Sequence, residues 1–240
     1  MKISDILKTF QTSVLFEGLS DAEIHLIYKA VRPSFQHYKK NSIIYNEGDI
    51  INAMGIIVSG EAAYTKYEIS GKSYIIDVWS ANEILCPEIA TGKHKNMPVA
   101  VVALNDCSIV FFSYEAMMNT GLIDSSVKMR IMQNLICYMD NVTVRKMYKM
   151  EVLSKYSLRD RILTYLMILE KKSCEKNSES DKLFNIKMTQ EQFARNLFVS
   201  RSALSSELNK MRREGLIDFQ GRMFVLNKDR IYKYGMAKSS

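Results

Sequence analysis

The spacing of hydrophobic residues changes near residue 35. Before that point, Ser20 and Glu23 have the spacing of a capping box, and a helical apolar stripe continues through Ala30 and ends before Pro33. After it, hydrophobic residues form short runs separated by turn residues, several of them glycine. The runs are 43–45, 54–58, 62–67, 74–79, 99–104 and 108–112. Short strands at such spacing predict an antiparallel sandwich or barrel.

Residues 124–150 lack Gly and Pro and carry two adjacent apolar seams with helical spacing. The seams are Ile131, Leu135, Tyr138 and Val142, and beside them Met129, Met132, Ile136 and Met139. One seam would suffice to pack the helix against the strand region, so two seams predict contact with the helix of a second copy. We assign the first seam to a coiled-coil-like homodimer contact. A helix buried within one subunit is the alternative explanation.

A polar stretch interrupts the segment that follows. Ser157 as N-cap, with Asp160 three residues later, begins a helix that carries Leu163 and Leu166 on its apolar face. The helix gives way to 171–182, whose Lys, Ser, Glu, Asn and Asp residues predict a surface loop.

Two short helices and a hairpin come next. Thr189 caps a helix that ends at about Leu197, and Ser200 caps a second helix over 201–214. Apolar runs in 216–226 flank a tight turn and predict a β-hairpin, the wing. This order of elements predicts a winged helix-turn-helix, which places its second helix in the DNA major groove.

The helix over 201–214 has an apolar face and a polar face. Leu204, Leu208 and Met211 share the inward face at spacings of four and three residues. Arginine on the other face can donate two hydrogen bonds to guanine, Ser and Asn can contact base edges or phosphates, and further cations attract the DNA backbone. The candidate DNA-binding residues are Thr189, Ser200, Arg201, Ser202, Ser205, Ser206, Asn209, Lys210, Arg213 and Arg222.

Charge is distributed unevenly along the chain, whose formal net charge is +7. Residues 187–240 contain eleven Lys/Arg and five Asp/Glu, whereas residues 1–186 contain twenty-two and twenty-one. An ordinary pair of packed helices would show the same two caps. The local basic excess and the hairpin favour a nucleic-acid-binding module instead.

Composition bears on location and redox state. Hydrophobic residues make up 47% of the chain and charged residues 25%, as in ordinary globular proteins. No apolar run approaches the roughly 18 residues that cross a bilayer, and the first residues lack the apolar core of a secretory signal. We therefore expect a cytoplasmic protein. Cys86, Cys107, Cys137 and Cys174 are widely spaced, which predicts reduced thiols rather than disulfides or a zinc site.

Over about residues 13–230, the chain resembles the cyclic-AMP receptor protein/FNR (CRP/FNR) family of transcription regulators. The motifs that carry the resemblance are Leu15-Phe16-x-Gly18-Leu19-Ser20, Gly48-Asp49, Val58-Ser59-Gly60, Val102-Ala103-Leu104 and Val199-Ser200-Arg201-Ser202. The resemblance implies an α+β fold: a cyclic-nucleotide-binding-type antiparallel β-roll over 1–123, a long dimerisation helix over 124–150, and a winged helix-turn-helix DNA-binding domain over 151–240. It also implies a homodimer on a palindromic operator, with Arg201 contacting a guanine in each half-site.

One part of the family's nucleotide site is missing. That site uses a Gly-Glu pair for the ribose and a downstream arginine for the cyclic phosphate. Here Pro87 precedes Glu88, and no arginine lies between residues 33 and 129, so the phosphate would lack its cation. We expect an effector other than cyclic AMP, or a dimer that is constitutively competent to bind DNA without an effector. The effector-pocket candidates are Glu83, Cys86, Glu88, Met97 and Val99.

Cofactor-dependent branches of the family also fit poorly. The iron–sulfur branch needs clustered N-terminal cysteines, and the first cysteine here is Cys86. The haem branch needs an axial histidine, and the three histidines, His25, His37 and His94, are isolated. We expect no cofactor and no metal, and a thiol switch at Cys86 or Cys107 stays open.

Two other classes of function compete with a DNA-binding regulator. An enzyme has little support, because the chain lacks a His-x-His pair, a Gly-rich phosphate loop and a nucleophile elbow. A ligand-sensing regulatory subunit that acts on a partner protein rather than DNA is the alternative. The expected partners are double-stranded DNA and a second copy of the chain. RNA polymerase and an unidentified small-molecule effector are further candidates, and we expect no membrane partner.

Overall fold

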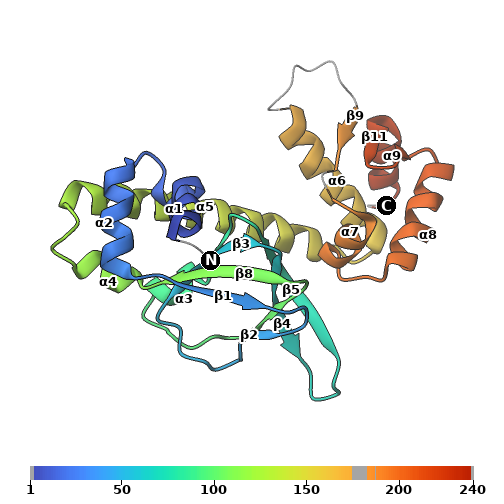
Figure 1. Ribbon diagram of the computed structural model, residues 1–240. Coiled ribbons are helices and arrows are strands. Elements are labelled where there is room, and N and C mark those ends of the chain that lie inside the picture. The colour runs from blue at the N-terminus through green and yellow to red at the C-terminus, as the bar shows by residue number, and fades with distance from the viewer. Residues whose placement is uncertain (1–2, 175–182, 187, 239–240) are drawn as a thin grey trace. The chain divides into compact units, whose positions relative to one another are not determined.

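The computed structural model describes residues 3–174, 183–186 and 188–238 (Figure 1). The chain forms two compact units, Met1–Val142 and Thr143–Ser240. The boundary lies inside the long helix α5 (Ser125–Leu153), so residues of this helix belong to both units. No helix in the described part of the chain is long and apolar enough to cross a membrane.

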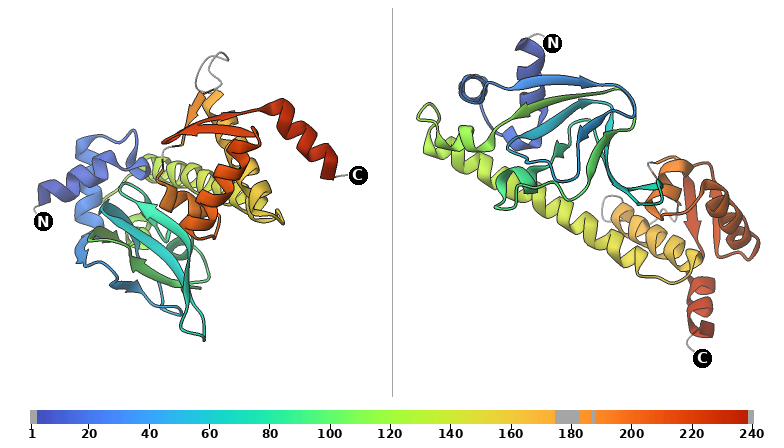
Figure 2. Two further views of the ribbon diagram at one scale, coloured as in Figure 1. Left: turned by 90° about the vertical axis from the view of Figure 1, so that its right-hand side faces the viewer. Right: turned by 90° about the horizontal axis from the view of Figure 1, so that it is seen from below.

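Short helices pack at one end of the N-terminal unit (Figures 1 and 2). They are α1 (Ile3–Thr12), the 3₁₀ helix η1 (Val14–Phe16), α2 (Asp21–Val31) and α4 (Tyr114–Asn119). The predicted capping box at α2 is confirmed, since the Ser20 amide donates to Glu23 Oε2 at 2.6 Å. This amide and the Ser20 hydroxyl stabilise the ionised Glu23 carboxylate and lower its pKa.

Two four-stranded antiparallel sheets form the β-roll, in the orders β1-β8-β3-β6 and β2-β7-β4-β5. Six strands match the six predicted runs: β2 (Ile43–Tyr45), β3 (Met54–Ser59), β4 (Glu61–Tyr67), β5 (Ser73–Ser80), β7 (Ala100–Ala103) and β8 (Cys107–Phe112). Outside those runs lie β1 (Ser34–Tyr38), β6 (Ile84–Leu85) and the short helix α3 (Pro87–Thr91). The predicted antiparallel β-roll is confirmed.

A single apolar core joins the sheets to the helices of this unit. Trp79 and Phe16 are among its largest fully buried side chains. Ile131 and Leu135 of α5 belong to the same cluster, so the first part of α5 packs within its own protomer.

The C-terminal unit contains a second core built from helices and a small sheet. Its elements are α6 (Leu158–Cys174), β9 (Leu183–Asn185), α7 (Gln190–Asn196), α8 (Arg201–Arg213), β10 (Ile217–Gln220), β11 (Met223–Leu226) and α9 (Lys228–Lys238). The sheet order is β10-β11-β9. The helix after Ser157 is longer than predicted, because 171–174 are helical rather than loop. The rest of the predicted loop, 175–182, lies outside the described residues.

Candidate nucleic-acid interface

Two capped helices build the helix-turn-helix. The Thr189 hydroxyl accepts the Gln192 amide at 3.2 Å, and the Thr189 amide donates to Gln192 Oε1 at 2.8 Å, which completes a capping box for α7. The Ser200 hydroxyl accepts the Ala203 amide at 3.1 Å and caps α8. Both caps satisfy amides that have no acceptor inside their helix. Thr189 and Ser200 are exposed, so each hydroxyl keeps a face toward solvent.

The buried face of α8 fixes which residues point outward. Leu204, Leu208 and Met211 are fully buried in a cluster with Phe193 and Leu197 of the preceding helix and its C-cap. A helix anchored along one face presents the opposite face to solvent. The apolar spacing seen in the sequence therefore orients α8.

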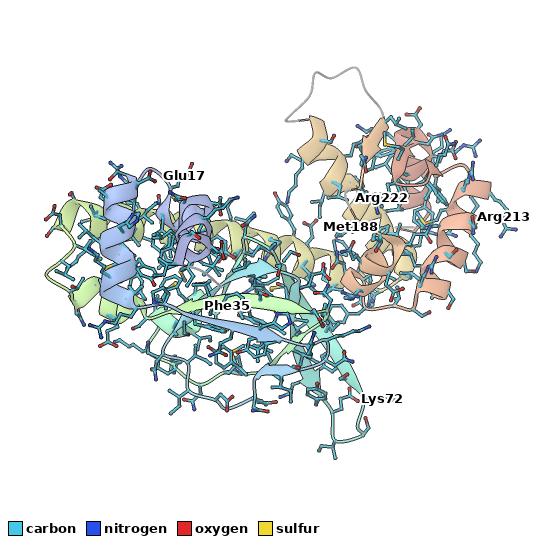
Figure 3. The ribbon with its side chains drawn as sticks, viewed as in Figure 1. Glu17, Phe35, Lys72, Met188, Arg213 and Arg222 are labelled. Atoms are coloured by element: carbon cyan, nitrogen blue, oxygen red, sulfur yellow. The ribbon has the colours of Figure 1, made fainter. Side chains whose placement is uncertain are left out.

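The outward face of α8 carries a line of polar side chains. Ser202, Ser206, Asn209 and Arg213 follow spacings of four, three and four residues, and all four are exposed. Figure 3 shows Arg213 extending from α8 away from the body of its unit. Ser205 is only partly exposed, at the margin of this line. The serines and the asparagine of this line match the chemistry of base contacts, and Arg213 at its end matches a contact with the phosphate backbone.

Four cations of the candidate site, Arg201, Lys210, Arg213 and Arg222, are exposed. Within the described residues, none of them makes an ion pair with an acidic side chain. Arg212, by contrast, pairs with Asp218 of β10 at 2.8 Å and lies over the Phe219 ring. This pairing ties Arg212 to the wing, although it stands next to Arg213 in the sequence.

Phe198 stands in the turn between α7 and α8 with a φ of 55°. A bulky residue in this left-handed region is strained. Its ring lies 5.4 Å from Lys149 Nζ of α5, a cation–π distance. The contact holds the turn against the part of α5 that belongs to the C-terminal unit.

Arg159 of α6 holds α8 from its other side, and sequence reasoning missed it. Its Nε donates to Glu207 Oε1 at 2.7 Å, and its two terminal nitrogens donate to the Glu214 carboxylate at 2.6 and 3.0 Å. Burial alone would lower the Arg159 pKa, but the two carboxylates outweigh it and raise that pKa. No local pattern in the sequence shows that residues some fifty positions apart meet.

The hairpin after α8 forms the wing. Gln220 pairs with Met223 across a tight turn at Gly221 and Arg222, and Phe219 stacks on Phe224 with ring centroids 5.2 Å apart. Arg222 stands exposed at the tip. Strand β9 adds to the other edge of β11, which fixes the base of the wing.

Two family models match the chain. The cyclic nucleotide-binding domain matches residues 35–121, and the Crp-like helix-turn-helix domain matches residues 160–234. The chain belongs to the CRP/FNR family of transcription regulators. No curated protein matches this CRP/FNR regulator in sequence.

Solved structures with the same fold cover nearly the whole regulator. CLP of Xanthomonas campestris, described as a c-di-GMP responsive global regulator, is 18% identical with a TM-score of 0.58, over 86% of this chain and 99% of CLP. A CooA mutant from Carboxydothermus hydrogenoformans is 15% identical with a TM-score of 0.55, over 93% and 96%. FixK2 of Bradyrhizobium japonicum is 17% identical with a TM-score of 0.51, over 84% and 96%. At such identities the likeness concerns the fold alone.

The structure brings only some of the effector-pocket candidates of this CRP/FNR protein together. Cys86 Sγ lies 3.9 Å from Met97 Sδ, and the Tyr64 hydroxyl donates to Cys86 Sγ at 3.5 Å. The Tyr64 ring packs on Trp79 with centroids 3.9 Å apart. These four side chains are buried and occupy one region of the β-roll core.

The remaining candidates lie around this cluster. Glu83 Oε2 accepts the Ser80 amide at 2.7 Å and so takes part in the turn before β6. Glu88 lies in the first turn of α3. Burial is the main cause of the raised pKa of the Cys86 thiol, and the charge of Glu88 raises that pKa further. Val99 is partly buried and packs against the core.

Cys86 and Cys107 are in poor surroundings for a thiol switch. Burial raises the pKa of Cys86 to about 12 and that of Cys107 to about 11. The thiolate is the reactive form, so both side chains are weak nucleophiles at neutral pH.

The structure corrects the choice of seam on α5. Ile131 is 0% exposed and Leu135 5%, and the Tyr138 hydroxyl donates to the Ile84 carbonyl at 3.1 Å, so these three serve the protomer's own core. The neighbouring seam contains Met129, Met132 and Ile136, which are exposed, and Met139, which is partly buried. A side chain already inside the protomer cannot contact a partner helix. The exposed seam is therefore the second one, through Met129, Met132 and Ile136.

Proposed function

We propose that this regulator acts as a homodimer that binds a palindromic operator, with one α8 helix in each of two successive major grooves. The outward line of Ser202, Ser206, Asn209 and Arg213 on α8 carries this proposal. These side chains are exposed on a helix whose opposite face is buried, and the cation Arg201 stands at its N-terminal end. Arginine, serine and asparagine have the donors and acceptors that base edges require.

The second seam of α5 supports the dimer. Met129, Met132 and Ile136 are large apolar side chains left exposed, and Met147 and Met150 extend the exposed series along the same helix. A seam of this kind on a long helix is typical of a helix that pairs with its copy. Two identical DNA-binding units on one symmetric dimer match the two halves of a palindrome.

The β-roll fits an effector other than cyclic AMP, or a dimer that binds DNA without any effector. The stretch from residue 33 to 129 contains no arginine, and Pro87 begins α3 where the family uses an amide donor. Tyr64, Trp79, Cys86 and Met97 pack against one another in the β-roll core, and two of them, Cys86 and Met97, are effector-pocket candidates. A cyclic phosphate would lack the arginine that neutralises it in the family.

Replacing single arginines separates base contacts from backbone contacts. An operator is first obtained by selecting tight binders from random duplexes with the wild-type protein. Arg201→Ala should then weaken binding to the selected duplex by about 1–3 kcal/mol and relax the preference at one base pair per half-site. Random duplex should be affected much less. Fluorescence anisotropy with both duplexes measures the two affinities.

Arg213→Ala is the matched control, because it removes the same charge from the same helix. If Arg213 contacts phosphate, selected and random duplexes should weaken by a similar factor. An equal loss on both duplexes for Arg201→Ala would show that Arg201 does not contact bases.

A further inference from the structure

A cavity of about 810 Å³ lies in the C-terminal unit, away from the helix-turn-helix. The end of α5, the second half of α6, the end of β11 and the first turns of α9 line it. Ligand sites for small molecules typically enclose about 300–1,000 Å³. The cavity is thus large enough for one such molecule.

Of the thirteen described residues that line the cavity, six are apolar or aromatic and seven are polar or charged. Leu226 is buried, and Ile168 and Ile231 pack against the core of the unit. Tyr232 adds an aromatic ring, and Lys172 Nζ lies over the Tyr148 ring, 4.3 Å from its centroid. Small-molecule sites combine such apolar walls with a few polar groups that fix orientation.

Direct contacts join the walls, so the cavity does not depend on a ligand to form. The Tyr234 hydroxyl of α9 donates to Asp160 Oδ1 of α6 at 3.2 Å. Lys228 Nζ of α9 lies 3.2 Å from Glu170 Oε2 of α6. A preformed site avoids the free-energy cost of ordering its walls when a ligand binds.

The charges of the lining cancel. Three lysines, Lys171, Lys172 and Lys228, stand against three acidic residues, Glu151, Glu170 and Asp229. The Glu170 side chain is only 14% exposed, and Lys228 already neutralises it. A ligand with a net charge would gain no compensating partner there, whereas the hydroxyls of Tyr148, Thr164 and Tyr232 can hydrogen-bond a neutral polar group.

We propose that this cavity is a binding site for a small aromatic molecule that has no net charge and carries a polar group able to form hydrogen bonds. The site is separate from the β-roll cluster of Tyr64, Trp79, Cys86 and Met97, and it does not depend on how α8 contacts DNA.

Nile red, an uncharged flat aromatic dye that fluoresces in apolar surroundings, is a direct probe. Titration of the full chain should give a saturable, blue-shifted signal with one site per chain. Met167 lines the cavity and is 49% exposed, so Met167→Trp can fill the space without disturbing the core. This variant should weaken dye binding by about tenfold or more, equivalent to about 1.4 kcal/mol.

Met236→Trp is the matched control, because Met236 is 58% exposed in the same unit and does not line the cavity. It should bind the dye as the wild type does. Tyr232→Ala removes one aromatic wall at an exposed position and should weaken binding by about threefold or more. Circular dichroism checks that each variant is folded.

Two results would overturn the proposal. One is the absence of saturable binding to the wild type. The other is a signal that survives in both cavity variants but disappears in Ile136→Glu, which would place the dye on the exposed seam of α5.

Discussion

Three arginines of α8 differ in their surroundings although their chemistry is the same. Arg212 is paired with Asp218 and packed on Phe219, whereas Arg201 and Arg213 are exposed without an acidic partner among the described residues. A guanidinium that already donates to a carboxylate has fewer donors for DNA. For a single arginine, an ion pair with a neighbouring carboxylate therefore decides whether its donors are available to a base or a phosphate.

Gly60 shows how a single position can hold the β-roll together. Its φ is 84°, and a Cβ there would lie 2.4 Å from the Asp106 carbonyl oxygen, a backbone atom that cannot move aside. Gly60→Ala should lower the free energy of unfolding of the N-terminal unit by about 3–5 kcal/mol, from backbone strain and the clash together. Trp79, the one tryptophan of the chain, is buried in this unit, so its fluorescence during urea denaturation measures the loss.

Gly71 provides the control for this prediction. Its φ is 80°, but nothing lies within 4 Å of the added Cβ. Gly71→Ala should therefore cost only the backbone strain, about 1–2 kcal/mol. Equal losses for the two variants would mean that the contact with Asp106 does not matter.

At the scale of elements, α5 combines an intramolecular and an intermolecular face. Ile136, 64% exposed, lies in the middle of the exposed seam. In a symmetric pair of helices, Ile136→Glu would place two carboxylates near each other in an apolar contact. The variant should weaken dimerisation at least tenfold, about 1.4 kcal/mol or more. Sedimentation equilibrium measures the dissociation constant.

Leu122→Glu is the matched control, since Leu122 is a similarly exposed apolar residue of the same unit outside α5. It should leave the dissociation constant unchanged. A dimer of wild-type strength in Ile136→Glu would contradict the assignment of the seam.

The anchoring of α8 on α6 gives a second prediction at this scale. The Arg159 side chain is 19% exposed and binds two carboxylates, so Arg159→Ala leaves Glu207 largely buried without its cation. The loss should be about 1–3 kcal/mol in the stability of the C-terminal unit. Amide hydrogen exchange along α8 measures it.

Arg212→Ala breaks an ion pair in which both side chains are more than half exposed. Exposed ion pairs contribute about 0–1 kcal/mol to stability. The protection of the α8 amides against hydrogen exchange should therefore change little. The same loss of protection in both variants would show that Arg159 has no special anchoring role.

The sequence predicted the elements with a strong local pattern. The capped helices, the six apolar runs and the hairpin are all present, because caps and periodic burial act within a few residues. It did not predict β6 or β9, which have two and three residues and gain their hydrogen bonds from distant strands. It also could not decide which seam of α5 faces the core, since two apolar seams look alike without their neighbours.

At the scale of the whole molecule, the two units have different charges and share one helix. The positive excess lies in residues 187–240, which belong to the C-terminal unit, while residues 1–186 are nearly neutral. The β-roll retains the strands and turns of its family without the arginine that a cyclic phosphate needs. We therefore expect cyclic AMP to leave DNA affinity unchanged, and the basic unit to provide that affinity.

The most direct test of this account is the affinity of the wild-type protein for its selected duplex and for random duplex, by fluorescence anisotropy at 50 and 200 mM salt. Binding through phosphates releases counterions, so both affinities should fall steeply as salt rises. The selected duplex should bind at least about 10³-fold more tightly than random duplex at the higher salt. Equal affinity for the two duplexes, or no binding at either salt concentration, would contradict a sequence-specific DNA-binding regulator.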